Sequence, residues 1–305
     1  MKCPEEEMDR KIREKLTLDG RARIISAQNI SLPKRPQFSH KGTFGKLLIV
    51  GGSVGFTGAP VMAAMSAQRG GTGLVYAAAA MEVYPILAQK LTEPMPFPVD
   101  SKDGKIAFSA LAEISEKAAS MSALLIGPGL GRSEETEKLT RTLVKETTLP
   151  LVLDADGINA FEGHIDELDG HERTLVLTPH DGEFARLGGD TSVGRLESAR
   201  GFAEKHACVL VLKGHRTLAA FPDGEVFVNF TGNSGMAKGG SGDVLAGLVS
   251  SFLAQGMKAK KAVCAAVYIC GAAADILAER MTEYCFTPAD VIETFPEIFK
   301  TIRLE

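Results

Sequence analysis

The residues with the clearest chemical meaning form a glycine-rich run in the last third of the chain. Gly239-Gly240-Ser241-Gly242-Asp243 leads directly into an apolar segment with helical spacing. Backbone N–H groups at a helix N-terminus attract an anion, and glycine lets the backbone approach it closely. A neighbouring carboxylate can accept a hydroxyl proton while these donors hold a phosphoryl group. The run therefore predicts a phosphoryl-transfer site with Asp243 as its base.

A helix N-cap is the alternative role for Asp243, because Asp is favoured at that position. An ordinary cap, however, does not need three neighbouring glycines. The run is also not a Walker A loop, since Lys238 precedes the glycines and no Gly-Lys-Ser or Gly-Lys-Thr follows them. Gly51-Gly52-Ser53-Val54-Gly55 lacks the spacing of a dinucleotide fingerprint, which disfavours hydride chemistry on a Rossmann fold.

Further glycine-rich turns follow apolar runs at Gly51-Gly52-Ser53, Gly127-Pro128-Gly129-Leu130-Gly131 and Lys213-Gly214. Ligands of open α/β sheets bind beyond the carboxyl ends of the strands. Each turn alone has an ordinary structural explanation, because strand-to-helix turns often need glycine. Together with the run before Asp243, they favour one crevice that holds an extended, phosphate-bearing ligand.

Several polar residues occupy similar positions after strands. Asp154 and Asp156 close the strand before them and could form Asx turns or orient a magnesium ion. Asn159 and Glu183 are weaker candidates for the same metal site. His180, which precedes Glu183, could shape its loop or bind a ligand.

The elements that must position these residues alternate between strands and helices, which predicts an α/β fold with a mostly parallel sheet. We expect one domain over residues 39–305, preceded by a charged N-terminal arm over residues 1–38. The expected strands are Leu47–Val50, Leu74–Ala78, Ala123–Ile126, Leu151–Leu153, Thr174–Leu177, Val209–Leu212 and a hairpin formed by Thr217–Phe221 and Glu225–Phe230. The expected helices are Ala59–Arg69, Ser109–Ala119, Ser133–Glu146, Gly182–Leu187, Ser192–Lys205, Asp243–Gln255, Lys258–Arg280 and Thr287–Lys300.

The composition is that of an ordinary globular protein. The 305 residues are 45% apolar and carry a formal net charge of −4, which disfavours a disordered chain and a general nucleic-acid binder. The five cysteines have no CxxC spacing, so we expect a reducing, cytoplasmic environment without a zinc site. The uncharged stretch Leu47–Gln68 is interrupted by glycines and Pro60, and we expect a strand, a loop and a helix there rather than a membrane span.

The motifs together resemble one family of the ribokinase-like superfamily, the ADP- or ATP-dependent NAD(P)H-hydrate dehydratases of the YjeF C-terminal domain type. The resemblance implies a ribokinase-like three-layer sandwich and covers the chain from about Ser39 to the C-terminal helix. The segments that carry it, besides the run before Asp243, are His40–Gly45, Gly51–Ala59, Gly127–Gly131, Asp154–Gly157, Leu177–Phe184, Lys213–Thr217 and Thr231–Asn233.

The resemblance implies a metabolite-repair reaction on the S epimer of hydrated NADH or NADPH (NADHX or NADPHX). ADP or ATP would phosphorylate the ring hydroxyl, and phosphate would then leave to restore the double bond, with AMP or ADP as the second product. Asp243 would be the base, and the backbone amides of Gly240, Ser241 and Gly242 would stabilise the transferred phosphoryl group. Magnesium is expected alongside the nucleotide.

The other site residues follow from the same resemblance by position. Ala59, Gly129, His180 and Asp243 match positions that line the pocket for the hydrated dinucleotide. Gly242 and the segment Lys213, Gly214, His215, Arg216 and Thr217 match positions that hold the adenine nucleotide. Lys213 could otherwise be a solvated loop charge.

Many members of this family carry an epimerase domain before the dehydratase. Because about 38 residues precede the first motif here, we expect a separate protein to supply the epimerase activity. We also expect a homo-oligomer, without a nucleic-acid or membrane partner. The stand-alone form favours ADP over ATP as the donor.

Two other functions remain open at this point. A ribokinase-like kinase of a small alcohol or vitamin precursor would share Asp243 and the glycine run but would leave its product phosphorylated. A non-catalytic nucleotide-sensing module would have no need of a base beside the anion site. The loop over Gly51–Ala59 and the turn Thr178-Pro179-His180 favour the dehydratase.

Overall fold

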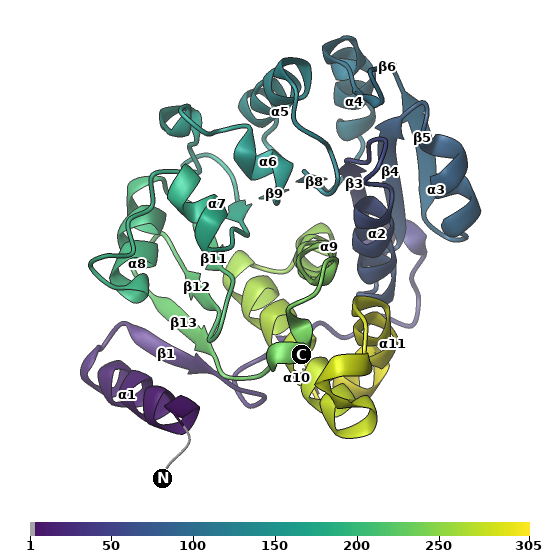
Figure 1. The fold of residues 1–305 in the computed structure, drawn as a ribbon. Coiled ribbons are helices and arrows are strands. Elements are labelled where there is room, and N and C mark those ends of the chain that lie inside the picture. Colours follow the sequence, from purple (N-terminus) through teal and green to yellow (C-terminus); the bar gives the residue numbers. More distant parts are fainter. Residues whose placement is uncertain (1–3) are drawn as a thin grey trace.

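Short apolar runs of the chain pair into a ten-stranded sheet in the computed structural model, which describes residues 4–305 (Figure 1). The strand order is β1-β13-β12-β11-β10-β9-β8-β3-β4-β5. The strands are β1 (Ala22–Ile25), β3 (Lys46–Val50), β4 (Leu74–Ala80), β5 (Met95–Val99), β8 (Ala123–Ile126), β9 (Leu151–Leu153), β10 (Leu175–Leu177), β11 (Val209–Leu212), β12 (Leu218–Ala220) and β13 (Val226–Asn229). Two small sheets pair β2 (Ser31–Leu32) with β14 (Arg303–Leu304) and β6 (Ser101–Lys102) with β7 (Lys105–Ile106).

From β11 to β5 in this order, each strand runs parallel to the next one. The strand β12, on the other side of β11, runs antiparallel to both β11 and β13. All four residues of β8 and all four of β11 are buried, as expected for strands that helices cover on both faces. Parallel strands end at the same edge of the sheet. The segments that follow β3, β8, β9, β10 and β11 therefore meet along one edge.

Helices cover both faces of the sheet. Figure 1 shows α2, α9 and α10 on one face and α4, α5 and α8 on the other. The helices are α1 (Pro4–Leu18), α2 (Gly58–Arg69), α3 (Tyr84–Lys90), α4 (Leu111–Ala118), α5 (Glu134–Glu146), α6 (Asp156–Asn159), α7 (Asp181–Arg186), α8 (Arg195–Lys205), α9 (Ser241–Ala254), α10 (Ala259–Cys285) and α11 (Pro288–Phe299). This arrangement is the three-layer α/β class that the alternation of strands and helices predicted.

Local signals in the sequence explain where several helices begin. The hydroxyl of Ser133 accepts a hydrogen bond from the N–H of Thr136 and caps α5, whose first turn is rich in glutamate. Thr287 caps α11 in the same way through Asp290, and Pro288 occupies the first turn. Both boundaries agree with the predicted helices to within a few residues.

Two regions differ from the predicted elements. Pro96 and Pro98 lie within β5, which the sequence did not predict as a strand, because proline cannot donate to a ladder. β5 tolerates them because it is an edge strand that pairs with β4 alone. In the N-terminal segment, α1 is followed by β1, which forms the opposite edge of the same sheet beside β13. The segment expected as an arm thus contributes a strand to the central sheet.

The stretch Leu47–Gln68 divides into β3, a loop and α2, as predicted. Another helix, α10, is apolar over a window long enough to cross a membrane, but 67% of that window is buried inside the fold. A core helix of a globular domain meets the same description. Consistent with this description, α10 packs against both α9 and α11.

Close packing between α2 and α9 sets the position of the glycine run. A Cβ atom on Gly247 of α9 would lie 2.3 Å from the carbonyl oxygen of Ala63 on α2, so the two backbones nearly touch. The Ser66 hydroxyl donates a 2.6 Å hydrogen bond to the carbonyl of Val244. The Ser251 hydroxyl likewise donates to the carbonyl of Ala67 at 3.0 Å. These contacts fix the N-terminus of α9 relative to the N-terminus of α2.

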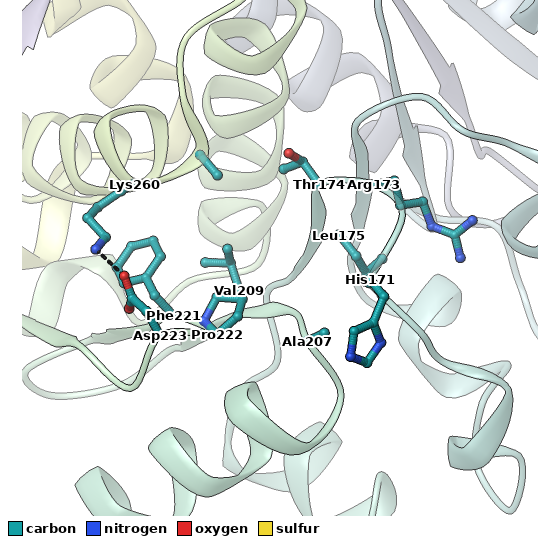
Figure 2. A pocket seen from close by; sticks show the side chains of 12 residues that line it. His171, Arg173, Thr174, Leu175, Ala207, Val209, Phe221, Pro222, Asp223 and Lys260 are labelled. Carbon is teal, nitrogen blue, oxygen red and sulfur yellow. Dashed lines mark hydrogen bonds and ion pairs between the residues drawn. The ribbon is translucent and has the colours of Figure 1, made fainter.

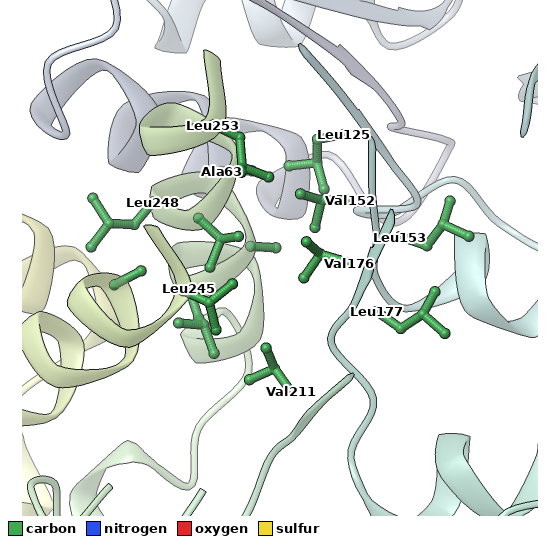
Figure 3. Packing of buried hydrophobic residues seen from close by; sticks show 14 of the residues in the cluster. Ala63, Leu125, Val152, Leu153, Val176, Leu177, Val211, Leu245, Leu248 and Leu253 are labelled. Atoms are coloured by element: carbon green, nitrogen blue, oxygen red, sulfur yellow. The ribbon is translucent and has the colours of Figure 1, made fainter. Parts of the chain in front are cut away.

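The hydrophobic core joins α9 to the centre of the sheet. Figure 3 shows Val152 and Val176 facing Leu245 and Leu248 of α9, whereas Leu177 points toward the opposite face. This alternation is the ordinary period of a strand, in which successive side chains point to opposite faces. Each central strand therefore contributes to the packing on both of its faces.

Gly127 ends β8 where the backbone of the next strand passes very close. Its φ is +129°, and an added Cβ atom would lie 1.8 Å from the carbonyl oxygen of Asp154. We expect Gly127→Ala to lower the free energy of unfolding by about 2 kcal/mol or more, because both the backbone angle and the contact resist a side chain. Urea denaturation measures the change.

Gly201 is the matched control, because it lies inside α8 and a Cβ atom added to it would have no neighbour within 4 Å. Gly201→Ala is expected to raise the free energy of unfolding by about 0.5–1 kcal/mol. A Gly127→Ala variant as stable as the wild type would show that the strand end tolerates a side chain.

Candidate functional site

The polar residues predicted at strand ends lie together along one edge of the sheet. Asp154 follows β9, Thr178 and His180 follow β10, and Lys213 follows β11. A backbone hydrogen bond joins the loop after β10 to the loop after β11. In it, the N–H of Lys213 donates to the carbonyl of Pro179 at 2.8 Å. The N-terminus of α9 lies over this edge.

A buried ion pair between Lys213 and Asp154 forms the centre of the site. The Lys213 Nζ lies 2.8 Å from the Asp154 Oδ1, and the Asp154 side chain is only 2% exposed. The hydroxyl of Thr178 donates to the same carboxylate oxygen at 2.8 Å. Glu183, which is also buried, places its Oε2 3.7 Å from the Lys213 Nζ. One ammonium group thus faces two buried carboxylates.

The charges of this cluster keep Lys213 protonated. Burial by itself lowers the pKa of a lysine, but the attraction of Asp154 and Glu183 outweighs burial and raises the pKa of Lys213. A charged group nearly surrounded by protein interacts strongly with its neighbours. Lys213 therefore supplies a permanent positive charge beside α9.

Asp243 lies in the first turn of α9, where it meets the same cluster. Burial and the negative charges of Asp154 and Glu183 raise the pKa of the Asp243 carboxyl to about 7, although Lys213 opposes the shift. A carboxyl group with a pKa near neutrality can accept and release a proton under physiological conditions. This is the property that a general base at this position requires.

The N-terminus of α9 has no side-chain cap. Its N-cap is Gly240, with φ +102°, and no side chain accepts a hydrogen bond from the first turn. Asp243 is three residues further on and is therefore not the N-cap, which excludes the alternative role considered for it. A Cβ atom on Gly242 would lie 3.2 Å from the Lys213 Nζ. The first-turn backbone thus lies beside the ammonium group, in an arrangement suited to an anion.

His180 has a structural role, and its imidazole ring is also partly exposed to solvent. Its Nδ1 accepts hydrogen bonds from the N–H groups of Gly182 at 3.0 Å and Glu183 at 3.2 Å, so it caps α7. The side chain is 55% exposed, and its Nε2 lies 3.5 Å from the Glu183 Oε1. The loop-shaping role is therefore present, while the exposed ring edge leaves ligand contact as a prediction.

The structure brings together the two glycine-rich segments predicted to line a pocket. A Cβ atom on Gly129 would lie 3.2 Å from the Cβ of Ala59 and 2.3 Å from the carbonyl oxygen of Phe56. Met62, one turn after Ala59 on α2, lies 3.8 Å from the position of a Cβ on Gly240. Ala59 and Gly129 therefore adjoin the same region as the glycine run.

The segment Lys213–Thr217 is held from two sides. Arg195, at the start of α8, donates to the carbonyl of Lys213 at 2.9 Å and to the carbonyl of His215 at 3.3 Å. Asp9 of α1 forms a bidentate ion pair with Arg216, and its Oδ1 lies 3.5 Å from the His215 Nε2. The guanidinium of Arg216 also donates to the carbonyl of Phe230 at 2.6 Å. The Arg216 side chain is thus engaged within the protein.

The four predicted metal candidates separate into two pairs. Asp156 accepts hydrogen bonds from the N–H of Gly131 at 2.9 Å and from Asn159, so this pair builds a turn. Asp154 and Glu183 lie in the Lys213 cluster instead. Among the side chains that the structure describes, no group of three or more acidic, histidine or cysteine residues forms a metal site. Carboxylate oxygens near a phosphate site nevertheless fit magnesium, which takes one or two carboxylates together with phosphate oxygens.

Sequence reasoning missed the residues that hold the site loops from a distance. Asp9, Thr178 and Arg195 each contact a predicted site residue, but Asp9 and Arg195 lie in no motif, and Thr178 is marked only as part of the turn Thr178-Pro179-His180. Asp9 and Arg216 are separated by 207 positions in the chain. Of the three, Thr178 is the residue that the sequence comes nearest to identifying, because it directly follows a predicted strand and lies two residues before His180.

A separate cavity lies at the opposite end of the strands. Figure 2 shows this pocket of about 480 Å³, where the Lys260 ammonium pairs with Asp223 at 2.7 Å. Its walls include Leu175 and Val209, which are the first residues of β10 and β11. Since the Lys213 cluster follows the last residues of those strands, this cavity is not part of the candidate site.

Comparison with known proteins gives a consistent result. The sequence model of the NAD(P)H-hydrate dehydratase family matches residues 47–297. The bifunctional NAD(P)H-hydrate repair enzyme of Moorella thermoacetica is 41% identical over 279 residues, which cover 90% of this chain and 53% of that protein. The chain spans about half the length of several such bifunctional relatives.

Shorter relatives match over most of their length. The ADP-dependent (S)-NAD(P)H-hydrate dehydratase of Neisseria meningitidis is 39% identical, with 80% of this chain and 81% of that protein covered. The crystal structure of the ADP/ATP-dependent NAD(P)H-hydrate dehydratase from Bacillus subtilis, co-crystallised with ATP and Mg²⁺, superposes with a TM-score of 0.77 at 30% identity and covers 92% of this chain and 99% of that one. The ribokinase-like fold class and the family resemblance are both confirmed.

The raised pKa of Asp243 predicts a cost in stability as the pH rises. The folded state keeps this proton up to a pH of about 7, whereas an exposed aspartate loses it near 3.8, so the contribution of Asp243 to stability falls as the pH rises between these values. We expect Asp243→Asn to raise the melting temperature by about 2 °C or more at pH 8, where the buried carboxylate is charged, and by less at pH 5, where the folded carboxyl is still protonated.

Differential scanning calorimetry at the two pH values measures this difference. Asp166→Asn removes an exposed carboxylate and is the control, for which no gain is expected at either pH. If Asp243→Asn destabilises the protein at pH 8, the carboxylate contributes favourable contacts that outweigh its burial.

Proposed function

The chain belongs to the NAD(P)H-hydrate dehydratase family, and we propose that it removes water from the S epimers of hydrated NADH and NADPH in a reaction driven by an adenine nucleotide. The observation that carries the proposal is the Asp243 carboxyl, with a pKa near neutrality, beside an uncapped helix N-terminus and the Lys213 ammonium. A base, backbone donors and a positive charge in one place support a phosphoryl-transfer site.

In the first step Asp243 would accept the proton of the ring hydroxyl while the hydroxyl oxygen attacks the terminal phosphorus of the nucleotide. The backbone N–H groups of Gly240, Ser241 and Gly242 would stabilise the charge on the transferred phosphoryl group. Lys213 lies beside Gly242 and would offset the same charge. Asp154 would keep Lys213 in place through their 2.8 Å ion pair.

In the second step the C–O bond would break, and phosphate would leave with the bonding electrons. Loss of a proton from the neighbouring ring carbon would restore the double bond of NADH or NADPH. Phosphate is a much better leaving group than hydroxide, which is why the nucleotide is consumed. The products are NAD(P)H, inorganic phosphate, and AMP when ADP is the donor.

We propose the following binding positions. Ala59, Gly129 and His180 would contact the hydrated dinucleotide, supported by the packing of Ala59 against Gly129 near the glycine run. Gly214, His215, Thr217 and the backbone of Arg216 would hold the adenine nucleotide, together with Lys213 and Gly242. Among the metal candidates, Asp154 with Glu183 beside it would hold magnesium bound with the nucleotide, because the Asp154 Oδ2, which is not the oxygen paired with Lys213, lies 3.8 Å from the position of a Cβ on Gly242.

ADP is the proposed donor, supported by the names of the Neisseria meningitidis relative, which is ADP-dependent, and of the Bacillus subtilis relative, which is ADP/ATP-dependent. Conversion of the R epimer would need a catalyst outside residues 4–305, where the segment before β3 contains one α-helix and two short strands. We also propose a cytoplasmic location, supported by the free thiols of Cys208, Cys264, Cys270 and Cys285. Assembly into a homo-oligomer stays a prediction that light scattering can test.

The direct test incubates the protein with hydrated NADH, magnesium and either ADP or ATP, and follows absorbance near 340 nm. We expect recovery of absorbance with ADP, and a loss of turnover of at least about 100-fold in Asp243→Asn because the base is removed. Asp166→Asn, an exposed aspartate, is expected to keep wild-type turnover.

Several results would contradict the proposal. Failure to recover absorbance with either nucleotide, together with phosphorylation of a vitamin alcohol, would identify a small-molecule kinase. Full turnover in Asp243→Asn would exclude this residue as the base. Nucleotide binding without any turnover in the wild type would indicate a sensing module.

The contact between α1 and the nucleotide segment leads to a separate prediction. Asp9 holds Arg216 and His215, and the hydrogen bond from Arg216 lowers the pKa of Asp9, so the carboxylate is charged near neutral pH. We expect Asp9→Asn to raise the KM for ADP about fivefold, equivalent to about 1 kcal/mol, because the segment loses its charged anchor. The kcat should change little.

Glu14→Gln is the matched control on the same helix, since Glu14 pairs with Arg10 on the surface. Initial rates at varied ADP concentration separate the two variants. An unchanged KM in Asp9→Asn would mean that Arg195 alone is sufficient to hold the segment.

A further inference from the structure

Lys238 directly precedes the glycine run, yet its ammonium group points away from the Lys213 cluster. The Nζ donates hydrogen bonds to the carbonyl of Glu283 at 2.8 Å and to the carbonyl of Phe286 at 2.6 Å. It also lies 4.5 Å from the centre of the Phe286 ring. Neither the proposed mechanism nor the family motifs assign this residue a role.

The carbonyl groups that Lys238 contacts belong to the end of α10. Thr282 interrupts this helix with φ +67°, and the helix ends at Cys285. The carbonyl groups of Glu283 and Phe286 therefore lie beyond this break, where backbone acceptors need donors from elsewhere in the protein, and the Lys238 ammonium donates to both of them. Lys238 thus occupies a small cation site that is built from backbone oxygen atoms.

The same end of α10 packs along the loop that carries the glycine run. A Cβ atom on Gly235 would lie 2.4 Å from the Phe286 ring, and one on Gly240 would lie 3.2 Å from Pro288. Ser234 donates a hydrogen bond to the Glu283 carboxylate. On the other side of Lys238, its own carbonyl accepts a 3.3 Å hydrogen bond from the N–H of Ser241. Lys238 therefore joins the first turn of α9 to the wall formed by residues 282–288.

We propose that Lys238 is a positioning residue for phosphoryl transfer, which acts by holding the glycine run against the end of α10. The glycine run needs such a support, because Gly239, Gly240 and Gly242 have no side chains to restrict the backbone. The N–H groups of the first turn can stabilise a phosphoryl group only if they are already aimed at it. This inference rests on the proposed function of the site, and Lys238 would act through the glycine run, because its ammonium group is engaged with Glu283 and Phe286.

The proposal differs from a general contribution to stability in one testable way. Removing the side chain beyond Cβ leaves two carbonyl groups around a space that held an ammonium group. A free ammonium ion has the same charge and a similar size, so it can enter that space and donate to the same oxygens. A sodium ion cannot donate hydrogen bonds to these oxygens. A tetramethylammonium ion is too large to enter the space and also has no N–H group to donate.

The test compares Lys238→Ala and Lys238→Met with the wild type in the hydrated-NADH assay. We expect kcat to fall by about 10- to 100-fold in both variants, because a small displacement of the donors is costly in the transition state, with KM values that change by less than about threefold. Addition of ammonium chloride should recover at least about a tenth of wild-type kcat in Lys238→Ala. Sodium chloride and tetramethylammonium chloride at the same ionic strength should not.

Lys90→Ala is the matched control, because Lys90 lies in the last turn of α3 and is exposed. It should keep wild-type kcat and show no response to ammonium. The proposal is overturned if Lys238→Met keeps kcat within about twofold of the wild type, or if lost activity does not respond to ammonium in Lys238→Ala. In the second case Lys238 contributes only to folding.

Hydrogen–deuterium exchange separates this proposal from the proposed function. Amides of residues 239–243 should exchange faster in Lys238→Met than in the wild type, whether or not the protein turns over hydrated NADH. If the wild type is inactive but this exchange accelerates, the dehydratase assignment fails while the positioning role stands. Unchanged exchange overturns the positioning role, whatever the activity of the wild type.

Discussion

The ion pair between Lys213 and Asp154 is the interaction on which the candidate site depends. It lies under the first turn of α9, with Glu183 and Asp243 close by, so that one ammonium group faces three carboxyl groups in a region from which much of the solvent is excluded. Three full negative charges cannot all be stabilised by one lysine in such a place. Burial, together with the negative charges of Asp154 and Glu183, therefore raises the pKa of Asp243, the carboxyl that the proposed reaction uses as its base.

The residues of this cluster are brought together by strand direction and helix packing, which do not depend on the chemistry of the site. Parallel strands place Asp154, Thr178 and Lys213 at one edge, because β9, β10 and β11 are neighbours that run in the same direction. The close contact of Gly247 with Ala63 then sets α9 against α2 and brings Asp243 over that edge. A burial pattern suited to stability thus determines where the reactive carboxyl group lies.

A second set of contacts holds the loops that a nucleotide would touch. Arg195 donates to the carbonyls of the Lys213 segment, Asp9 engages Arg216, and Lys238 donates to the end of α10. In each case a charged side chain ties a glycine-containing segment of the site to a neighbouring element. Such hydrogen bonds are stronger than those between neutral groups, which suits loops that must stay in place while phosphate charge moves nearby.

The sequence alone determined the features that depend on neighbours in the chain. The glycine run and Asp243 are contiguous, the apolar runs have strand length, and the caps of α5 and α11 lie within a few residues of their helices. The strand β5 was missed because its two prolines disfavour a strand. Proline is tolerated in an edge strand, and only the tertiary structure shows that β5 lies at the edge of the sheet. Tertiary structure alone decided the pairing of Asp9 with Arg216 and of Lys213 with Asp154, since these partners are 207 and 59 positions apart. Local propensity carries no information on such pairs, because they meet only after the sheet and helices have packed and excluded water.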